Sequence, residues 1–106
     1  MATQQDPGIY LIVEFNWPAK ITKEIGASAK ALHAAVAASD WINDPVAASG
    51  GLGAGPSSIW VFHLPDYAAL DRLFKDREDP VSQAYYAFFS NMQDVEDSVR
   101  EAVLWL

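Results

Sequence analysis

The chain contains no cysteine, which excludes disulfides, thiolate metal sites and cysteine nucleophiles. Basic residues are scarce, with 7 Lys and Arg against 14 Asp and Glu and a formal net charge of −7. Because nucleic acids and anionic membrane surfaces are bound through clustered Lys and Arg, we expect neither as a partner. No apolar run approaches the ~20 residues that a transmembrane helix needs, and residues 1–8 do not resemble a signal peptide. These absences, with the lack of cysteine, predict a cytoplasmic protein.

The length of 106 residues is that of one domain, which we expect to span 1–106 with a flexible polar leader over 1–7. Hydrophobic residues make up 51% of the chain and charged residues 20%, which is ordinary for a globular core.

Two short segments, 8–16 and 57–63, are apolar on both faces if they are strands. In the first, one face carries Ile9, Leu11, Val13 and Phe15, and the other carries Tyr10, Ile12, Glu14 and Asn16. In the second, Ile59 and Val61 oppose Trp60 and Phe62. A strand that is apolar on both faces must be covered on both. Since a chain this short has helices for one face only, we expect the other face to meet a second copy in a homodimer.

The segment between the two strands begins with a helix. Thr22 is placed to cap it, and an apolar stripe at helical spacing carries it to residue 39 or 40. Beside the stripe, a row of small residues predicts close packing of this helix on the sheet: Ala27, Ala31, Ala34 and Ala38. Residues 46–55 fit a weak strand, a loop, or both in succession.

Two further helices and a last strand are expected after the second apolar strand. Asp66 is placed to cap a helix whose buried edge is Tyr67, Leu70 and Phe74. A third helix over 80–92 has Pro80 as its first residue; its apolar residues are Val81, Tyr85, Phe88, Phe89 and Met92. The end of the chain fits either a helix or a strand, and we favour a strand from about Ser98, because the sheet needs more members.

This order of elements predicts an α+β fold of the ferredoxin-like type, βαββαβ with an antiparallel sheet and an extra helix after the second main helix. With its doubly apolar strands, the chain resembles the dimeric α/β-barrel superfamily, in which two such sheets face each other across a homodimer. Residues 58–64 and the helix after them resemble the central unit of NIPSNAP-like and antibiotic-biosynthesis-monooxygenase-like domains. The resemblance implies functions as diverse as cofactor-free oxidation and haem degradation.

The haem-degrading branch is disfavoured by the residues themselves. Those enzymes use an Asn in the early strand, a Trp in the helix after the central strand and a His in the next helix. Asn16 is a poorly placed match for the first, Arg72 stands at the Trp position, and residues 80–92 contain no His. We therefore expect no cofactor.

Polar residues at the strands are the candidate site. His63, at a strand end, is a candidate general base, although a bond to a neighbouring loop accounts for it more simply. Glu14 is either a base or ligand anchor in a closed barrel, or a surface or interface charge. Tyr10, Glu14 and Asn16 share a face and would give a pocket a phenol, an acid and an amide. Trp60 and Phe62 either line a cavity for a flat apolar ligand or pack in the core.

Two other patterns are weaker. The glycine-rich segment 50–55 leads into a strand and lacks the Gly-Lys-Ser/Thr sequence, so it is not a nucleotide-binding loop; a hairpin or a lip over a pocket fits better. The two histidines lie far apart in the chain, so we expect no metal site.

The sequence thus predicts a homodimer that binds or oxidises a small apolar or aromatic molecule in its barrel cavity without a cofactor. The alternative is a dimerisation or interaction module whose barrel is packed shut.

Overall fold

A computed structural model describes residues 8–103. The predicted leader 1–7 lies outside the described residues. The elements follow in the order β1 (Ile9–Asn16), α1 (Lys23–Ala37), β2 (Val46–Ser49), β3 (Ser58–Leu64), α2 (Tyr67–Lys75), α3 (Pro80–Phe89) and β4 (Gln93–Glu101).

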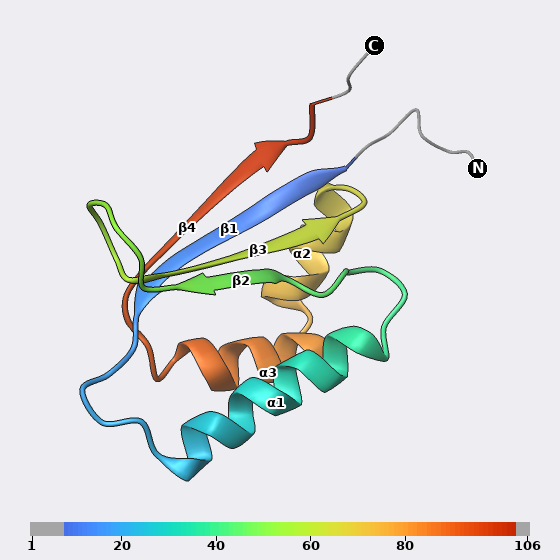
Figure 1. Ribbon diagram of the computed structural model, residues 1–106. Coiled ribbons are helices and arrows are strands. Elements are labelled where there is room, and N and C mark those ends of the chain that lie inside the picture. The colour runs from blue at the N-terminus through green and yellow to red at the C-terminus, as the bar shows by residue number, and fades with distance from the viewer. Residues whose placement is uncertain (1–7, 104–106) are drawn as a thin grey trace.

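The four strands form one antiparallel sheet in the order β2-β3-β1-β4, and the helices lie on one side of it (Figure 1). This is the ferredoxin-like α+β fold that the sequence predicts, with α3 as the extra helix. The doubly apolar strands β1 and β3 are the central pair. The face of each that points to the helices is buried in the core, which explains one half of the apolar pattern.

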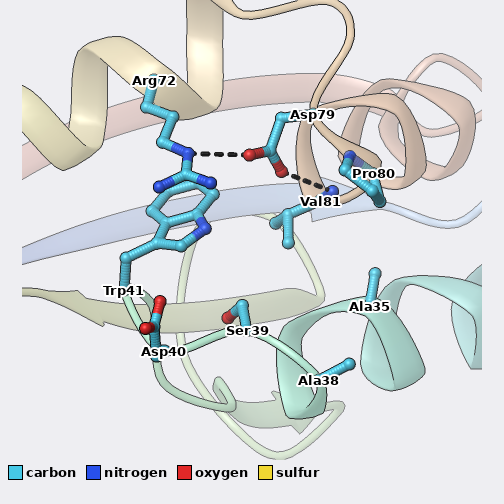
Figure 2. Close-up of a pocket in the computed structure, with 9 residues that line it drawn as sticks. All are labelled: Ala35, Ala38, Ser39, Asp40, Trp41, Arg72, Asp79, Pro80 and Val81. Atoms are coloured by element: carbon cyan, nitrogen blue, oxygen red, sulfur yellow. Dashed lines mark hydrogen bonds and ion pairs between the residues drawn. The ribbon is translucent and has the colours of Figure 1, made fainter.

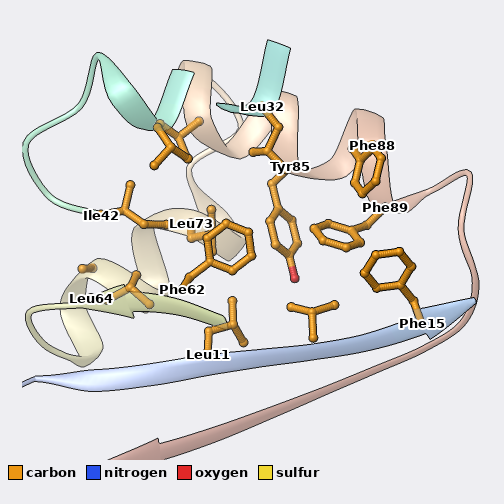
Figure 3. Packing of buried hydrophobic residues seen from close by; sticks show 14 of the residues in the cluster. Leu11, Phe15, Leu32, Ile42, Phe62, Leu64, Leu73, Tyr85, Phe88 and Phe89 are labelled. Atoms are coloured by element: carbon orange, nitrogen blue, oxygen red, sulfur yellow. The ribbon is translucent and has the colours of Figure 1, made fainter. Parts of the chain in front are cut away.

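The core fills the space between the sheet and the helices (Figure 3). Ile9, Leu11, Val13 and Phe15 of β1 point into it, and each is at most 3% exposed. The buried residues of α3 are Val81, Ser82, Tyr85, Phe88 and Phe89. The alternation predicted for β1 and four of the five apolar residues predicted inside α3 are thereby confirmed; the fifth, Met92, is buried just after the helix.

Both predicted helix caps are present, and a third was not predicted. Thr22 and Asp66, and the unpredicted Asp79, each accept a hydrogen bond at the start of a helix, from the N–H groups of Ile25, Ala69 and Val81. Pro80 occupies the first turn of α3, where it has no hydrogen bond to lose. The loop at 50–55 follows β2, so this region is a strand and a loop in succession, with positive φ at four glycines.

Four expectations are corrected. The row Ala27, Ala31, Ala34 and Ala38 is exposed, because α1 packs mainly on α3 and does not press this row against the sheet. Helix α1 ends at Ala37, before the predicted residue 39 or 40. Of the edge predicted for α2, Leu70 and Phe74 pack partly buried against the core, but Tyr67 is 53% exposed, and the fully buried residues of the helix are Ala69 and Leu73. The last strand begins at Gln93, ahead of the predicted Ser98.

Within residues 8–103, no helix is long and apolar enough to cross a membrane.

Candidate functional site

The face of the sheet that carries no helix, here called the open face, is the surface to which the sequence assigned most candidate residues. Opposed residues of antiparallel strands point to the same side, so the registers define three rows across it. The first row is Arg100, Tyr10 and His63; the second is Ser98, Ile12, Val61 and Val46; the third is Glu96, Glu14, Ile59 and Ala48.

The centre of the open face is apolar and uncovered. Ile12 and Val61 are partly buried, Val46 is 72% exposed, and Ile59 beside them is 37% exposed. Tyr10, in the first row, is 39% exposed. Neighbouring apolar side chains gathered on one exposed face mark an interaction surface more often than chance exposure does.

Opposite charges lie at the two ends of the open face. Glu14 and Glu96 are direct cross-strand partners, which is an unfavourable pairing of like charges. Within residues 8–103 no ion pair joins either of them to a cation. Arg100 lies in the first row, where its Nη1 donates to the carbonyl of its own neighbour Val99 at 2.9 Å. The acidic pair therefore lies at one end and the guanidinium at the other.

His63 is held by the connection between α1 and β2. Its Nδ1 lies 3.0 Å from Asn43 Nδ2, and the Asn43 N–H donates to the His63 carbonyl at 3.0 Å. Because the amide nitrogen is a donor, Nδ1 is the acceptor in this contact. Nε2 lies against Gly8, where a Cβ would approach it to 2.8 Å. This is the simpler interpretation of His63, a strand-end residue bonded to a neighbouring loop.

Glu14 and His63 are not neighbours. His63 pairs with Tyr10, and Glu14 lies four residues further along β1. At a rise of about 3.4 Å per residue the two rows are ~14 Å apart. One protomer does not bring these two candidate catalytic groups together.

The side-chain amide of Asn16 makes two hydrogen bonds that hold neighbouring segments together. Its Oδ1 accepts from the Ser57 N–H at 2.9 Å, and its Nδ2 donates to Asp94 Oδ2 at 3.1 Å. Asp94 has a φ of 56° beside the bulge where the β1–β4 register shifts. Asn16 thus joins the end of the glycine-rich loop to this irregularity.

Trp60 and Phe62 lie on the helix-covered face, away from Tyr10 and Glu14. Phe62 is fully buried, and the Trp60 ring stacks on Phe88 with centroids 4.8 Å apart and planes 13° from parallel. Of the two interpretations that the sequence left open, the geometry is that of core packing. A cavity on the open face would not include them.

A phenol and a carboxyl meet on the covered face at the sheet edge. Tyr85 Oη donates to Asp97 Oδ1 at 3.5 Å. Burial raises the pKa of Tyr85 above its ordinary value, and the nearby Asp97 charge adds to this. Burial also raises the pKa of Asp97, while the Tyr85 hydrogen bond opposes that rise. Both groups are therefore biased toward their neutral forms.

Arg100 and Glu96 were missed as site residues by sequence reasoning. The last strand was expected to begin at Ser98, which left Glu96 outside the sheet. The signal was present in the alternation of residues 96, 98 and 100, but only the β1–β4 register shows that these residues share a face with Glu14. Among residues 8–103 no group of three or more His, Asp or Glu is placed to hold a metal ion.

Among known proteins, solved structures are similar to this chain, and they share its fold. No protein-family model and no curated protein sequence matches the chain. A dimeric ferredoxin-like protein of unknown function from Thermobifida fusca YX is similar in structure, with a TM-score of 0.63 and 22% identity over 92% of this chain and 93% of that one. A dimeric protein of unknown function and ferredoxin-like fold from Bacteroides fragilis has a TM-score of 0.60 and 10% identity over 89% and 95%. The chain therefore shares the ferredoxin-like fold of these proteins.

Proposed function

We propose that the protein is a homodimer whose two open faces meet, and that the chamber between them holds a small apolar or aromatic molecule without a cofactor. The observation that carries the proposal is the uncovered apolar centre of the open face, around Ile12, Ile59 and Val61. Burial of such a surface against a second copy removes it from water, which is the main favourable term in association. With no cysteine and no basic cluster, we place this dimer in the cytoplasm.

The charges on the open face fit a second copy in one orientation. A two-fold axis that lies between the facing sheets, at right angles to the strands, reverses the order of the rows. Arg100 of one protomer then lies over the partner's Glu96, and Tyr10 lies over the partner's Glu14. An axis parallel to the strands keeps the rows and reverses the order of the strands, so Glu14 would lie over the partner's Ile59 and Arg100 would meet neither glutamate. The surface is self-complementary in the first arrangement, as a two-fold interface requires.

The structural neighbours support a dimer, without specifying which faces meet. Both are described as dimeric, and both share the fold over about nine-tenths of this chain. The resemblance to the dimeric α/β-barrel superfamily implies face-to-face sheets as well. For this chain the dimer is our proposal, because 22% identity carries the fold alone.

The ligand is inferred from the walls that the chamber would have. Ile12, Ile59 and Val61 give it apolar sides, and Tyr10 and Glu14 give it a phenol and a carboxylate. Glu14 is the group placed to anchor a ligand or accept its proton, because the ring nitrogens of His63 face Asn43 and Gly8. The pairing of Tyr10 with the partner's Glu14 would make this site composite.

The alternative is a dimer with no chamber, and one observation favours it. The middle of the open face is filled with branched aliphatic side chains, Ile12, Val61 and Val46, which can interdigitate with those of a second copy. Such a protein would be a dimerisation or interaction module.

Native mass spectrometry of the purified chain tests both parts together. We expect a species of twice the 11.6 kDa chain mass, with additional non-covalent mass that is lost on denaturation. A bare dimer that also fails to take up hydrophobic probes such as naphthol supports the closed module. A monomer at all concentrations would overturn the proposal.

A matched pair of variants then tests the ligand site. Glu14→Gln removes the open-face carboxylate, and Glu24→Gln removes an exposed carboxylate in the first turn of α1. We expect Glu14→Gln to lose the bound mass while the dimer persists, and Glu24→Gln to retain it. Equal retention in both variants would remove Glu14 from the site.

A further inference from the structure

A second hollow lies on the helical side of the molecule, separate from the open face. It is bounded by the end of α1, the segment that follows it, α2 and the start of α3, and it encloses about 420 Å³ (Figure 2). That volume falls within the range of small-molecule sites, about 300–1,000 Å³. Its charged side chains are Asp40, Arg72 and Asp79.

Arg72 is fixed in place at the rim of this hollow. Its Nε donates to Asp79 Oδ2 at 2.7 Å, and its guanidinium carbon lies 4.4 Å from the centroid of the Trp41 ring. Asp79 is held in turn, since its side chain is 5% exposed and its Oδ1 accepts from the Val81 N–H at 2.9 Å. A buried carboxylate and an aromatic face thus set the orientation of the guanidinium before any ligand arrives.

The contacts of Arg72 with Asp79 and Trp41, here called the clamp, leave several hydrogen-bond donors unused. Only Nε of Arg72 is hydrogen-bonded within residues 8–103, and the side chain is 48% exposed, so both Nη groups remain open. Trp41 Nε1 also has no hydrogen-bond partner there, and Figure 2 shows it on the side of the ring that faces Val81. Ala35 and Ala38 form the opposite wall, and their small side chains leave the space empty. The open donors and the space thus lie together in one hollow.

We propose that this hollow binds a small organic monocarboxylate with a compact apolar body. The two Nη groups of a fixed guanidinium match the two oxygens of a planar carboxylate, and the Trp41 N–H supplies a further donor. Ala35, Ala38 and Val81 offer an apolar wall to the rest of the molecule. Asp40 on the rim and the net charge of −7 disfavour phosphate esters and other polyanions. The site does not depend on the homodimer.

Titration followed by ¹H–¹⁵N NMR tests the site with two probes that share a phenyl body, phenylacetate and phenylethylamine. We expect phenylacetate to give saturable shifts at the Trp41 indole N–H and at the amides of Ala38 and Val81. Phenylethylamine should leave these signals unchanged. No saturable shift with phenylacetate up to about 10 mM, a concentration at which even a millimolar site is occupied, would overturn the proposal, and so would equal binding of the amine.

Variants separate the binding role from the structural one. Arg72→Gln should weaken phenylacetate binding by about tenfold or more, as expected for loss of a charged hydrogen-bond donor. Arg77→Gln is the matched control, because Arg77 also stacks on an aromatic ring, Tyr86, but lies outside the hollow. Binding that is equally strong in both variants would contradict the proposal.

Two further changes keep the Arg72–Asp79 clamp intact. Ala38→Leu fills the hollow and should abolish phenylacetate binding while the circular dichroism spectrum stays unchanged. Asp40→Asn removes the opposing charge and should tighten binding by about twofold to threefold, as expected for a partly screened surface charge. Unaltered binding in Ala38→Leu, or weaker binding in Asp40→Asn, would overturn the assignment.

Discussion

The two faces of the sheet are built from the same strands and differ in what covers them. On the helix-covered face, Leu11, Val13 and Phe15 of β1 are fully buried. On the open face, Tyr10 of the same strand is 39% exposed and stands in a row with Arg100. Alternate residues of one segment thus make two different surfaces, one completed by the chain's own helices and one left for another molecule.

The largest effect is expected on the helix-covered face. Phe62→Ala removes a ring with no exposed surface and leaves a cavity, so the free energy of unfolding should fall by about 3–5 kcal/mol. Urea denaturation measures it, with Val103→Ala at a 66% exposed position as the control. A loss below about 1 kcal/mol would show that this face is not the tightly packed one. If Phe62→Ala does not fold, Phe62→Leu should give a smaller loss.

A charge in the centre of the open face should act on assembly and spare the fold. Val61→Asp places a carboxylate where two copies would meet, and we expect the dimer dissociation constant to rise about 100-fold or more. Analytical ultracentrifugation measures the constant, and circular dichroism checks that the protomer stays folded. Ala27→Asp, at an exposed position of α1, is the control for added charge. If the Val61→Asp protomer unfolds and does not merely dissociate, the open face is needed for the fold as well as for assembly.

The orientation of the two copies is tested by exchanging charges. Arg100→Glu should weaken the dimer about tenfold, because it sets like charges opposite each other. The double variant Arg100→Glu, Glu96→Arg restores opposite charges and should bring the dissociation constant back to within about threefold of wild type. A double variant as weak as the two single changes combined would exclude the proposed axis, whatever the stoichiometry.

The smallest effect concerns the edge of the helix-covered face. Burial raises the pKa of Asp97 in the folded protein, so the folded state binds this proton more tightly than the unfolded state does. The resulting stability is present below the ordinary aspartate pKa and is lost as the pH rises through the raised value. Asp97→Asn should flatten this part of the stability–pH curve, as measured by urea unfolding at a series of pH values. A curve with the wild-type slope would remove Asp97 as its origin.

Local signals in the sequence predicted the fold well. Period-two alternation placed the core residues of β1 and β3, because one face of each strand had to be buried. Thr22 and Asp66 marked helix starts as caps, since a cap depends on residues only about three positions apart, and Pro80 marked the start of the third helix.

The site was harder to predict because it depends on contacts between distant segments. Aromatic side chains such as Trp60 and Phe62 occur both in the lining of a cavity and in a core. Only the position of the helices shows which environment these two residues have. Glu96 becomes a partner of Glu14 only through a register that includes a bulge near Asn16. The clamp of Trp41, Arg72 and Asp79 joins three segments, and nothing in their local sequence requires it.

In the dimer that we propose, a second copy covers the open face. The most direct measurement is the effect of a soluble paramagnetic agent on the methyl NMR signals of Ile12, Ile59 and Val61. We expect these signals to be protected in the wild-type protein, and Ile12 and Ile59 to become accessible in Val61→Asp, while the core methyls of Leu11 and Val13 stay protected in both. Full accessibility of Ile12 and Ile59 in the wild-type protein, at concentrations near 1 mM where even weak dimers form, would contradict it.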